Sequence, residues 1–241
     1  MSAVTFKEST MDELVNWGWK DNYSSVVQMA FAQRPQSSEI PTETLLKIKS
    51  EIERSLILKQ ALIKVNQESE ARIESLKVLQ LSVIREACKS HVIACLPTGF
   101  GKSLIYQMLS CMYSNKFVIV ASPLNAIITE QCTKMPNVTI NVKDLNINDD
   151  PPNIVIGHPE DLLLDKSKDY FKKYKHMISN IIIDEAHCLL QWGAQFRPKF
   201  AELSSLRALC PKANVLALTA TASPEDRKKI AEKLALNVRL N

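Results

Sequence analysis

The sequence predicts an α/β fold, in which helices cover both faces of a doubly wound parallel sheet, preceded by a helical N-terminal extension. From about residue 76 onward, short apolar runs rich in β-branched residues alternate with helical stretches or loops. Each run is continuously apolar, which is typical of strands buried on both faces of a parallel sheet. The predicted strands are residues 91–96, 117–121, 153–157, 180–184 and 214–218.

Residues 1–75 are predicted to form the extension, and residues 76–241 the sheet domain. Within 42–65, apolar side chains recur at three- and four-residue steps with Lys and Glu between them, which is the periodicity of an amphipathic helix. Residues 11–33 also favour a helix, whereas the sequence RPQSSEIP at 34–41 favours a linker. The extension is therefore expected to be all-helical.

The composition excludes several classes of protein. A chain of 241 residues that is 46% hydrophobic and 23% charged is typical of a globular protein. It has no uninterrupted apolar run of about 18 residues and no basic region followed by an apolar core at its N-terminus, so neither a membrane span nor a secretory signal is predicted. The net charge of +4 permits a polyanion-binding face without indicating one. The six cysteines form no C-x-x-C pair, which argues against a zinc ribbon or a disulfide framework.

Polar or small residues follow each predicted strand. These residues are 98–103, 122–123, 158–160, 184–187 and 219–221. In an open parallel sheet, the carboxyl ends of the strands line one crevice, and ligands bind there. We therefore expect the chemistry of the molecule at this edge.

The sequence LPTGFGKS at 96–103 follows a strand and precedes a helical stretch at 104–111, as a phosphate-binding P-loop does. Glycines let the backbone turn its N–H groups toward phosphate oxygens, and the helix dipole adds positive potential. Lys102 would reach the β- and γ-phosphates, and the Ser103 hydroxyl would bind Mg²⁺. Leu96 stands where the strict pattern has glycine, and a glycine-containing surface turn is the alternative interpretation. The predicted nucleotide-binding residues are Thr98, Gly99, Phe100, Gly101, Lys102 and Ser103.

A second motif strengthens this prediction. Asp184 and Glu185 follow the apolar run at 181–183, where a carboxylate can hold magnesium through water and its neighbour can polarise the attacking water as a general base. A lone Asp-Glu pair is more often a solvated strand end. Because both motifs lie on the same predicted edge, nucleotide binding is the favoured interpretation.

LPTGFGKS, DEAH and TATA occur in the order found in superfamily 2 helicases, and residues 76–240 resemble their first RecA-like domain. The stretch DEAHCLLQWGAQFRP at 184–198 is similar to the RecQ family, whose DEAH motif runs into C-x-x-Q-W-G-x-x-F-R-P. The resemblance implies an ATP-dependent 3′-to-5′ DNA helicase that uses ATP and Mg²⁺ and acts on single-stranded or forked DNA. A nuclear location is expected from the DNA role alone, with the cytoplasm as the alternative. The implied catalytic residues are Lys102, Asp184, Glu185 and His187.

Five residues are implied to contact DNA. Trp192, Phe196 and Arg197 match the family loop that senses single-stranded DNA and links it to ATP hydrolysis. Aromatic faces stack on bases, and a guanidinium can stack or pair with phosphate, so the residue types agree. The alternative is that Trp192 and Phe196 are core residues. Ser122 and Pro123 are similar to the motif that holds the DNA backbone.

Three further segments match family motifs, and the sequence differs from the family at two places. His187 is similar to the family histidine that bridges the nucleotide and DNA sites, and residues 218–222 to the motif that couples nucleotide state to the second domain. Gln80 resembles the glutamine that reads the adenine edge. Lys77 replaces the arginine that stacks on adenine, so base preference is expected to be loose. Residues 194–195 are Ala-Gln instead of the usual His-Asp of the aromatic loop.

The family's second RecA-like domain supplies arginine fingers from a Q-x-x-G-R-x-x-R motif, and none of the eight arginines here lies in such a motif. Because arginine fingers contribute about 10³ to 10⁵ in rate, we expect a truncated helicase that binds ATP and hydrolyses it slowly alone. The alternative is a non-catalytic module that binds ATP and nucleic acid and docks a protein partner through residues 1–75. The lysine-rich run at 166–175 is expected to be a solvated loop face, with a DNA site as the alternative.

Overall fold

The computed structural model describes residues 42–191 and 202–236, and the chain divides into two compact units, Met1–Lys59 and Gln60–Asn241. The predicted amphipathic helix is present as α3 (Thr42–Ser69), which crosses from the first unit into the second. The helix predicted at 11–33 and the linker at 34–41 lie outside the described residues. The domain boundary near residue 75 stays a prediction.

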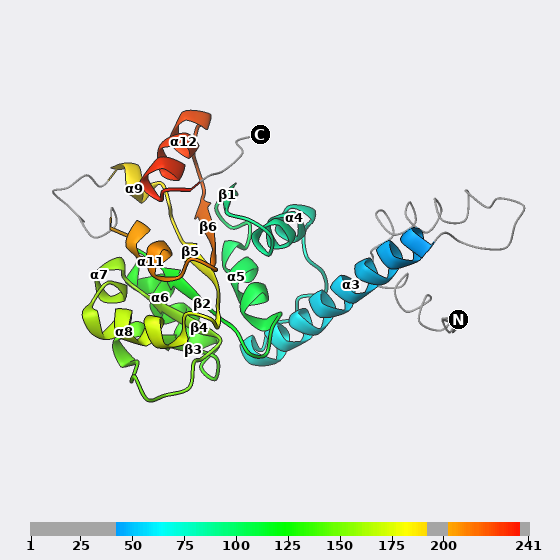
Figure 1. The fold of residues 1–241 in the computed structure, drawn as a ribbon, viewed down its shortest axis with the longest axis horizontal. Helices are drawn as coiled ribbons and strands as arrows, with labels where there is room; N and C mark the ends of the chain where they lie inside the picture. The colour runs from blue at the N-terminus through cyan, green and yellow to red at the C-terminus, as the bar shows by residue number, and fades with distance from the viewer. Residues whose placement is uncertain (1–41, 192–201, 237–241) are drawn as a thin grey trace, which may run out of the picture. The chain divides into compact units, whose positions relative to one another are not determined.

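The second unit contains a six-stranded sheet in which every strand pair is parallel, with the order β1-β6-β5-β2-β4-β3 (Figure 1). All five predicted strands are confirmed. The sixth, β3, is a three-residue edge strand that the apolar-run pattern did not predict. The strands are β1 (Val92–Cys95), β2 (Phe117–Ala121), β3 (Thr139–Asn141), β4 (Ile154–Gly157), β5 (Ile178–Ile183) and β6 (Asn214–Thr219).

Helices cover both faces of the sheet, as predicted. Phe117 and Ile119 of β2 belong to a buried cluster with α8 and α11, whereas Val118 and Val120 point to the opposite face, where α5 contacts β2. The helices are α4 (Val78–Ala87), α5 (Lys102–Cys111), α6 (Asn125–Lys134), α7 (Pro159–Leu162), α8 (Asp165–Tyr174), α9 (Cys188–Gln191), α11 (Ser204–Leu209) and α12 (Pro224–Lys233).

The expectation that residues 166–175 form a loop is wrong. Residues 166–174 belong to α8, whose C-cap is Lys175, and this helix buries Tyr170 and Phe171 and leaves Lys172 and Lys173 exposed. The Tyr170 ring meets the Phe117 ring edge-on at a centroid distance of 6.4 Å, which attaches the helix to β2. Two buried aromatic side chains therefore make this lysine-rich segment a structural helix.

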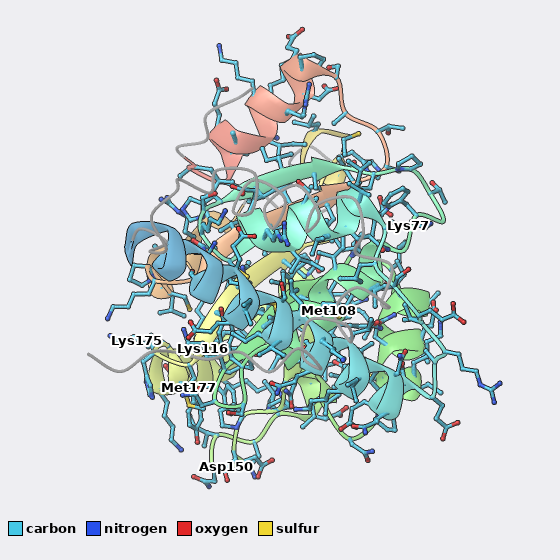
Figure 2. All side chains as sticks on the ribbon, turned by 90° about the vertical axis from the view of Figure 1, so that its right-hand side faces the viewer. Lys77, Met108, Lys116, Asp150, Lys175 and Met177 are labelled. Atoms are coloured by element: carbon cyan, nitrogen blue, oxygen red, sulfur yellow. The ribbon has the colours of Figure 1, made fainter. Side chains whose placement is uncertain are left out.

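α5 begins at the carboxyl edge of the sheet. Met108 of α5 is fully buried, whereas Lys77, just before α4, lies at the exterior of the domain (Figure 2). The buried middle of α5 fixes this helix against the sheet. Its N-terminus, at Lys102, lies directly after the loop that follows β1. Among the described residues, we find no helix with the length and apolar character needed to span a membrane.

Candidate nucleotide-binding site

The loop between β1 and α5 has the backbone that phosphate binding requires. Gly99 and Gly101 have φ values of +74° and +85°, a left-handed conformation that glycine adopts without steric cost. Gly101 is also the N-cap of α5. The first N–H groups of a helix have no partner within the helix, so those of α5 are available to an anion. Leu96, which stands in place of the first motif glycine, is buried, and its N–H donates to Thr219 O at 2.9 Å.

Gln80 supports this loop from α4. Its Nε2 donates to Phe100 O at 3.0 Å and to Gly101 O at 3.2 Å, and its Oε1 accepts from Lys77 N at 2.9 Å. The side chain is buried, and these three bonds use both of its donor hydrogens. The adenine-reading role that the resemblance implied for Gln80 stays a prediction, and in this conformation its amide holds the loop carbonyls. The Lys77 ammonium lies 4.5 Å from the centre of the Phe100 ring.

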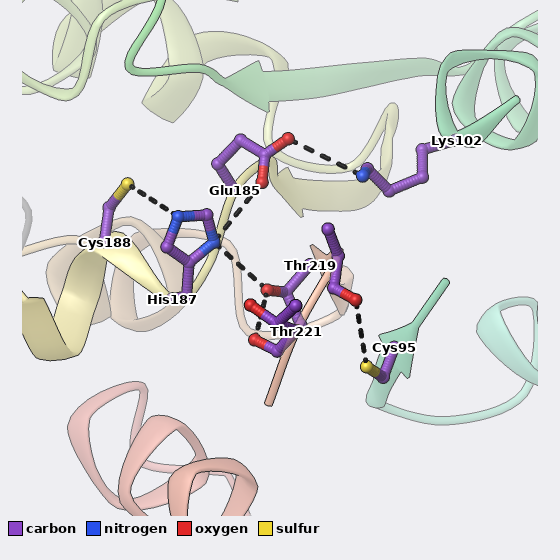
Figure 3. Close-up of polar contacts among 8 residues, drawn as sticks. Cys95, Lys102, Glu185, His187, Cys188, Thr219 and Thr221 are labelled. Atoms are coloured by element: carbon purple, nitrogen blue, oxygen red, sulfur yellow. Dashed lines mark hydrogen bonds and ion pairs between the residues drawn. The ribbon is translucent and has the colours of Figure 1, made fainter. Parts of the chain in front are cut away.

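The loop lysine meets the acidic motif across the site (Figure 3). Lys102 Nζ lies 3.6 Å from Glu185 Oε1, and Glu185 Oε2 lies 3.3 Å from His187 Nδ1. Glu185 has a φ of +48°, which is strained for a residue with a side chain. Its neighbours hold the turn in place, because Asp184 N donates to Ala121 O at 2.9 Å and Ala186 N to Leu218 O at 2.8 Å. The flanking strands β2 and β6 therefore position the two carboxylates.

Asp184 differs from its neighbour in burial. It is 4% exposed, and burial, followed by the nearby Glu185 charge, raises its pKa from 3.8 to about 6. The Glu185 backbone, followed by the Lys102 charge, lowers the same pKa and offsets part of this rise. A buried carboxylate with a raised pKa lacks enough positive charge around it, and a bound cation would supply that charge.

Residues around Asp184 fit magnesium, although no cluster of three His, Cys, Asp or Glu side chains occurs in the described ranges. Mg²⁺ prefers oxygen ligands and is usually held by one or two protein groups together with phosphates and waters. Ser103, at the start of α5, offers a hydroxyl, and Tyr106, one turn further along the same helix, is fully buried. Burial, followed by the Asp184 and Glu130 charges, raises the pKa of Tyr106. Sequence reasoning missed Tyr106, three positions after Ser103 on α5.

His187 connects the acidic motif to the end of β6. Its Nδ1 lies 3.2 Å from Thr219 Oγ1, and Thr219 Oγ1 donates to Thr221 O at 3.0 Å. Because the threonine hydroxyl hydrogen is used toward Thr221, the proton of this contact belongs to His187 Nδ1, which donates to Thr219 and faces Glu185. The structure thus brings together the predicted Glu185 and His187 with the 218–222 motif.

The DNA-contacting predictions fall in two places. Trp192, Phe196 and Arg197 lie outside the described residues. Ser122 and Pro123 follow β2 at the carboxyl edge and are both buried, with the exposed Leu124 and Asn125 directly after them. The predicted DNA contact of Ser122 and Pro123 stays a prediction.

A pocket of about 420 Å³ adjoins the loop. This volume lies within the range of about 300–1,000 Å³ that ligand pockets span. Four of the six predicted loop residues line it, Thr98 and Phe100 do not, and the rest of the lining comes from α5, α6 and the segment that precedes α4. The lining residues are Ser69, Ala71, Ile73, Gly99, Gly101, Lys102, Ser103, Leu104, Gln107, Glu130, Gln131 and Lys134. The segment 69–73 carries no recognisable motif, so sequence reasoning had no signal for it.

Comparison with known families agrees with this geometry. The model of the DEAD/DEAH box helicase family matches residues 77–230, which span the whole sheet. The chain belongs to this helicase family. It is 31% identical over 183 residues to the rat ATP-dependent DNA helicase Q5, covering 66% of this chain and 18% of that protein. It is 30% identical over 170 residues to the Xenopus laevis RecQ-like DNA helicase BLM, covering 62% of this chain and 12% of that protein.

These relatives confirm the predicted RecQ-like resemblance of this helicase domain. The chain spans less than a fifth of the length of either relative. Among solved structures, the helicase MrfA bound to DNA is similar in fold, with a TM-score of 0.55 and 17% identity, covering 86% of this chain and 30% of that one. The RecA-like helicase fold predicted from the motifs is therefore confirmed.

Proposed function

We propose that this helicase domain binds Mg·ATP and couples its hydrolysis to movement along single-stranded DNA in the 3′-to-5′ direction, and thereby to unwinding of forked DNA. The observation that carries the proposal is the approach of Lys102 Nζ to Glu185 Oε1 at 3.6 Å, beside a loop with two left-handed glycines. A cation and a carboxylate so placed suit phosphoryl transfer to water. The relatives named as ATP-dependent DNA helicases support the same chemistry.

Each residue of the site has a distinct task in this proposal. Backbone N–H groups of residues 98–103 bind the phosphates, and the Lys102 ammonium neutralises charge that develops on the γ-phosphate. Glu185 accepts a proton from the attacking water, and the hydrogen bonds of His187 orient it. When bound, Mg²⁺ would neutralise phosphate charge, held by the Ser103 hydroxyl and Asp184.

DNA binding is assigned to Trp192, Phe196 and Arg197, which match the aromatic motif of the family, and to the end of β2. Trp192 and Phe196 would stack on unpaired bases, Arg197 would contact phosphate, and Ser122 and Pro123 would hold the backbone. The names of the relatives, which are DNA helicases, support DNA as the partner, and a nuclear location is proposed from that DNA role, with the cytoplasm as the alternative. We predict that Trp192→Ala leaves ATP affinity unchanged and removes the stimulation of hydrolysis by single-stranded DNA. Full stimulation in that variant would contradict the loop assignment.

The proposal is tested by measuring ATP turnover with and without single-stranded DNA for the unsubstituted chain and for Lys102→Ala. We expect slow turnover that DNA stimulates and that Lys102→Ala abolishes. Unchanged turnover in the variant would contradict the assignment of the site. ATP binding without any turnover, even when a second helicase domain is supplied, would instead favour the non-catalytic module whose residues 1–75 dock a protein partner.

A further inference from the structure

The last residue of α3 and the segment that follows it form one wall of the pocket beside the phosphate loop. Ser69, Ala71 and Ile73 line the pocket together with the loop residues Gly99 and Gly101. All of these residues belong to the compact unit Gln60–Asn241. A ligand whose phosphates lie on the loop would therefore have its remaining part beside this wall.

The wall has little regular structure of its own. α3 ends at Ser69, Glu70 has a φ of +51°, and the residues from there to Lys77 form neither helix nor strand. A left-handed conformation costs a residue with a side chain about 1–2 kcal/mol, so the turn at Glu70 needs support from its surroundings.

Asn66 supplies that support through a pair of hydrogen bonds to one residue of the wall. Its Nδ2 donates to Ile73 O at 2.9 Å, and its Oδ1 accepts from Ile73 N at 3.0 Å. Both polar atoms of one side-chain amide thus bind both polar groups of the Ile73 backbone. The bonds close the turn between α3 and the wall. The adjacent Val65 is fully buried, which fixes the helix position from which Asn66 reaches.

The pocket has a composition that suits a nucleoside. Ala71, Ile73 and Leu104 offer apolar surface for a flat base, and Glu130 and Lys134 of α6 offer charged groups for a sugar or a base edge. These apolar and charged side chains lie next to the loop that would bind the phosphates.

From these observations we infer that Asn66 is a positioning residue of the nucleotide site, which holds the 69–73 wall against the nucleoside part of the bound nucleotide. The inference rests on the proposed ATP binding and deepens it. Its physical basis is preorganisation, because a wall that is ordered before binding loses less conformational entropy when the ligand arrives. The end of the long N-terminal helix then belongs to the nucleotide site.

The test compares two ligands that share their phosphates. Binding of Mg·ATP and of Mg·tripolyphosphate to the full chain is measured by calorimetry for the unsubstituted protein and for Asn66→Ala. We expect Asn66→Ala to weaken ATP binding by about five- to tenfold, as two lost hydrogen bonds allow, and to leave tripolyphosphate binding within about twofold. A residue with only a general structural role would weaken both ligands equally.

A matched control is available on the same side of the domain. Asn137 Nδ2 donates to Glu68 Oε2 at 3.4 Å, so Asn137→Ala removes an asparagine contact with the end of α3 without touching the wall. This variant should bind both ligands like the unsubstituted chain. If Asn66→Ala does not fold, Asn66→Asp takes its place, since it keeps the acceptor for Ile73 N–H and loses the donor to Ile73 O.

The outcomes separate this inference from the proposed function. Unchanged ATP binding in the Asn66 variant, or equal weakening of both ligands, would overturn the positioning role while ATP binding by the unsubstituted chain stands. If the unsubstituted chain binds neither ligand, the proposed function and this inference both fail.

Discussion

The Lys102 ammonium lies 3.6 Å from the Glu185 carboxylate, and the two side chains are only 12% and 19% exposed. Partial burial strengthens this pair, because solvent screens it less than a surface pair. A bound triphosphate would compete with Glu185 for the lysine and would leave the carboxylate beside the γ-phosphate. In the proposed function, one ion pair would thus link nucleotide binding to the preparation of Glu185 as the general base.

Replacement of Glu185 should separate binding from hydrolysis. We expect Glu185→Gln to bind Mg·ATP at least as well as the unsubstituted chain and to hydrolyse it about 10²- to 10⁴-fold more slowly, because the amide cannot accept the proton. Glu86→Gln, which changes an exposed carboxylate paired with Lys89, is the control and should leave turnover unaltered. Turnover of Glu185→Gln within twofold of normal would exclude Glu185 as the base.

Asp184 should destabilise the fold at neutral pH. Its raised pKa means that the side chain binds a proton more tightly in the folded chain than in the unfolded chain. Protonated Asp184 is therefore fully compatible with the fold below about pH 4, and the fold loses stability as the pH rises through about 6 and the buried side chain ionises. Asp184→Asn should therefore raise the free energy of unfolding at pH 7.5 by up to about 3 kcal/mol while it abolishes turnover.

The gain should disappear in denaturant unfolding at about pH 4, where both side chains are neutral. Asp169→Asn, at an exposed residue paired with Lys172, should change stability by less than about 0.5 kcal/mol. A stability gain for Asp184→Asn that does not depend on pH would contradict the assigned cause.

The two loop glycines should differ in their tolerance of a side chain. A Cβ at Gly101 would lie 2.7 Å from Gln80 Nε2, whereas a Cβ at Gly99 meets no heavy atom within 4 Å in the described part of the chain. Gly99→Ala should cost about 1 kcal/mol from its positive φ alone, and Gly101→Ala about 2–3 kcal/mol because Gln80 must also move. Denaturant unfolding measures both values. Equal costs would show that Gln80 does not pack on the loop.

The Thr219 hydroxyl should hold the His187 ring in position beside Glu185. Thr219→Val keeps the shape and removes the oxygen that accepts from His187 and donates to Thr221. We expect ATP affinity within about twofold of normal and turnover reduced about tenfold, because the imidazole loses the bond that orients it beside Glu185. Ser179→Ala removes a hydroxyl bonded to Phe117 O on β5, away from the site, and is the control. Unreduced turnover in Thr219→Val would contradict this link.

The sequence predicted the central part of the fold because buried parallel strands leave a clear signal. Continuous apolar runs gave β1, β2, β4, β5 and β6. β3 left no such signal, since it has three residues, two of them polar, at the edge of the sheet. α8 was misread because its lysines dominate its composition, although Tyr170 and Phe171 attach it to the core.

The sequence predicted the parts of the site that belong to recognisable motifs. Lys102 and Glu185 were placed on one edge because parallel topology alone brings strand ends together. The Asn66 pair with Ile73 has no sequence pattern, because it depends on the path of a turn between two helices. The partners of Gln80 were equally inaccessible, since the same amide could serve a base or a backbone.

The most direct test of this account is calorimetric titration of the folded chain with Mg·ATP, performed in parallel on Lys102→Ala. Saturable binding to the unsubstituted chain, and binding at least tenfold weaker to the variant, is the predicted result, since the lysine supplies the positive side chain beside the loop. No uptake by the folded, unsubstituted chain, or equal affinity in the variant, would contradict it.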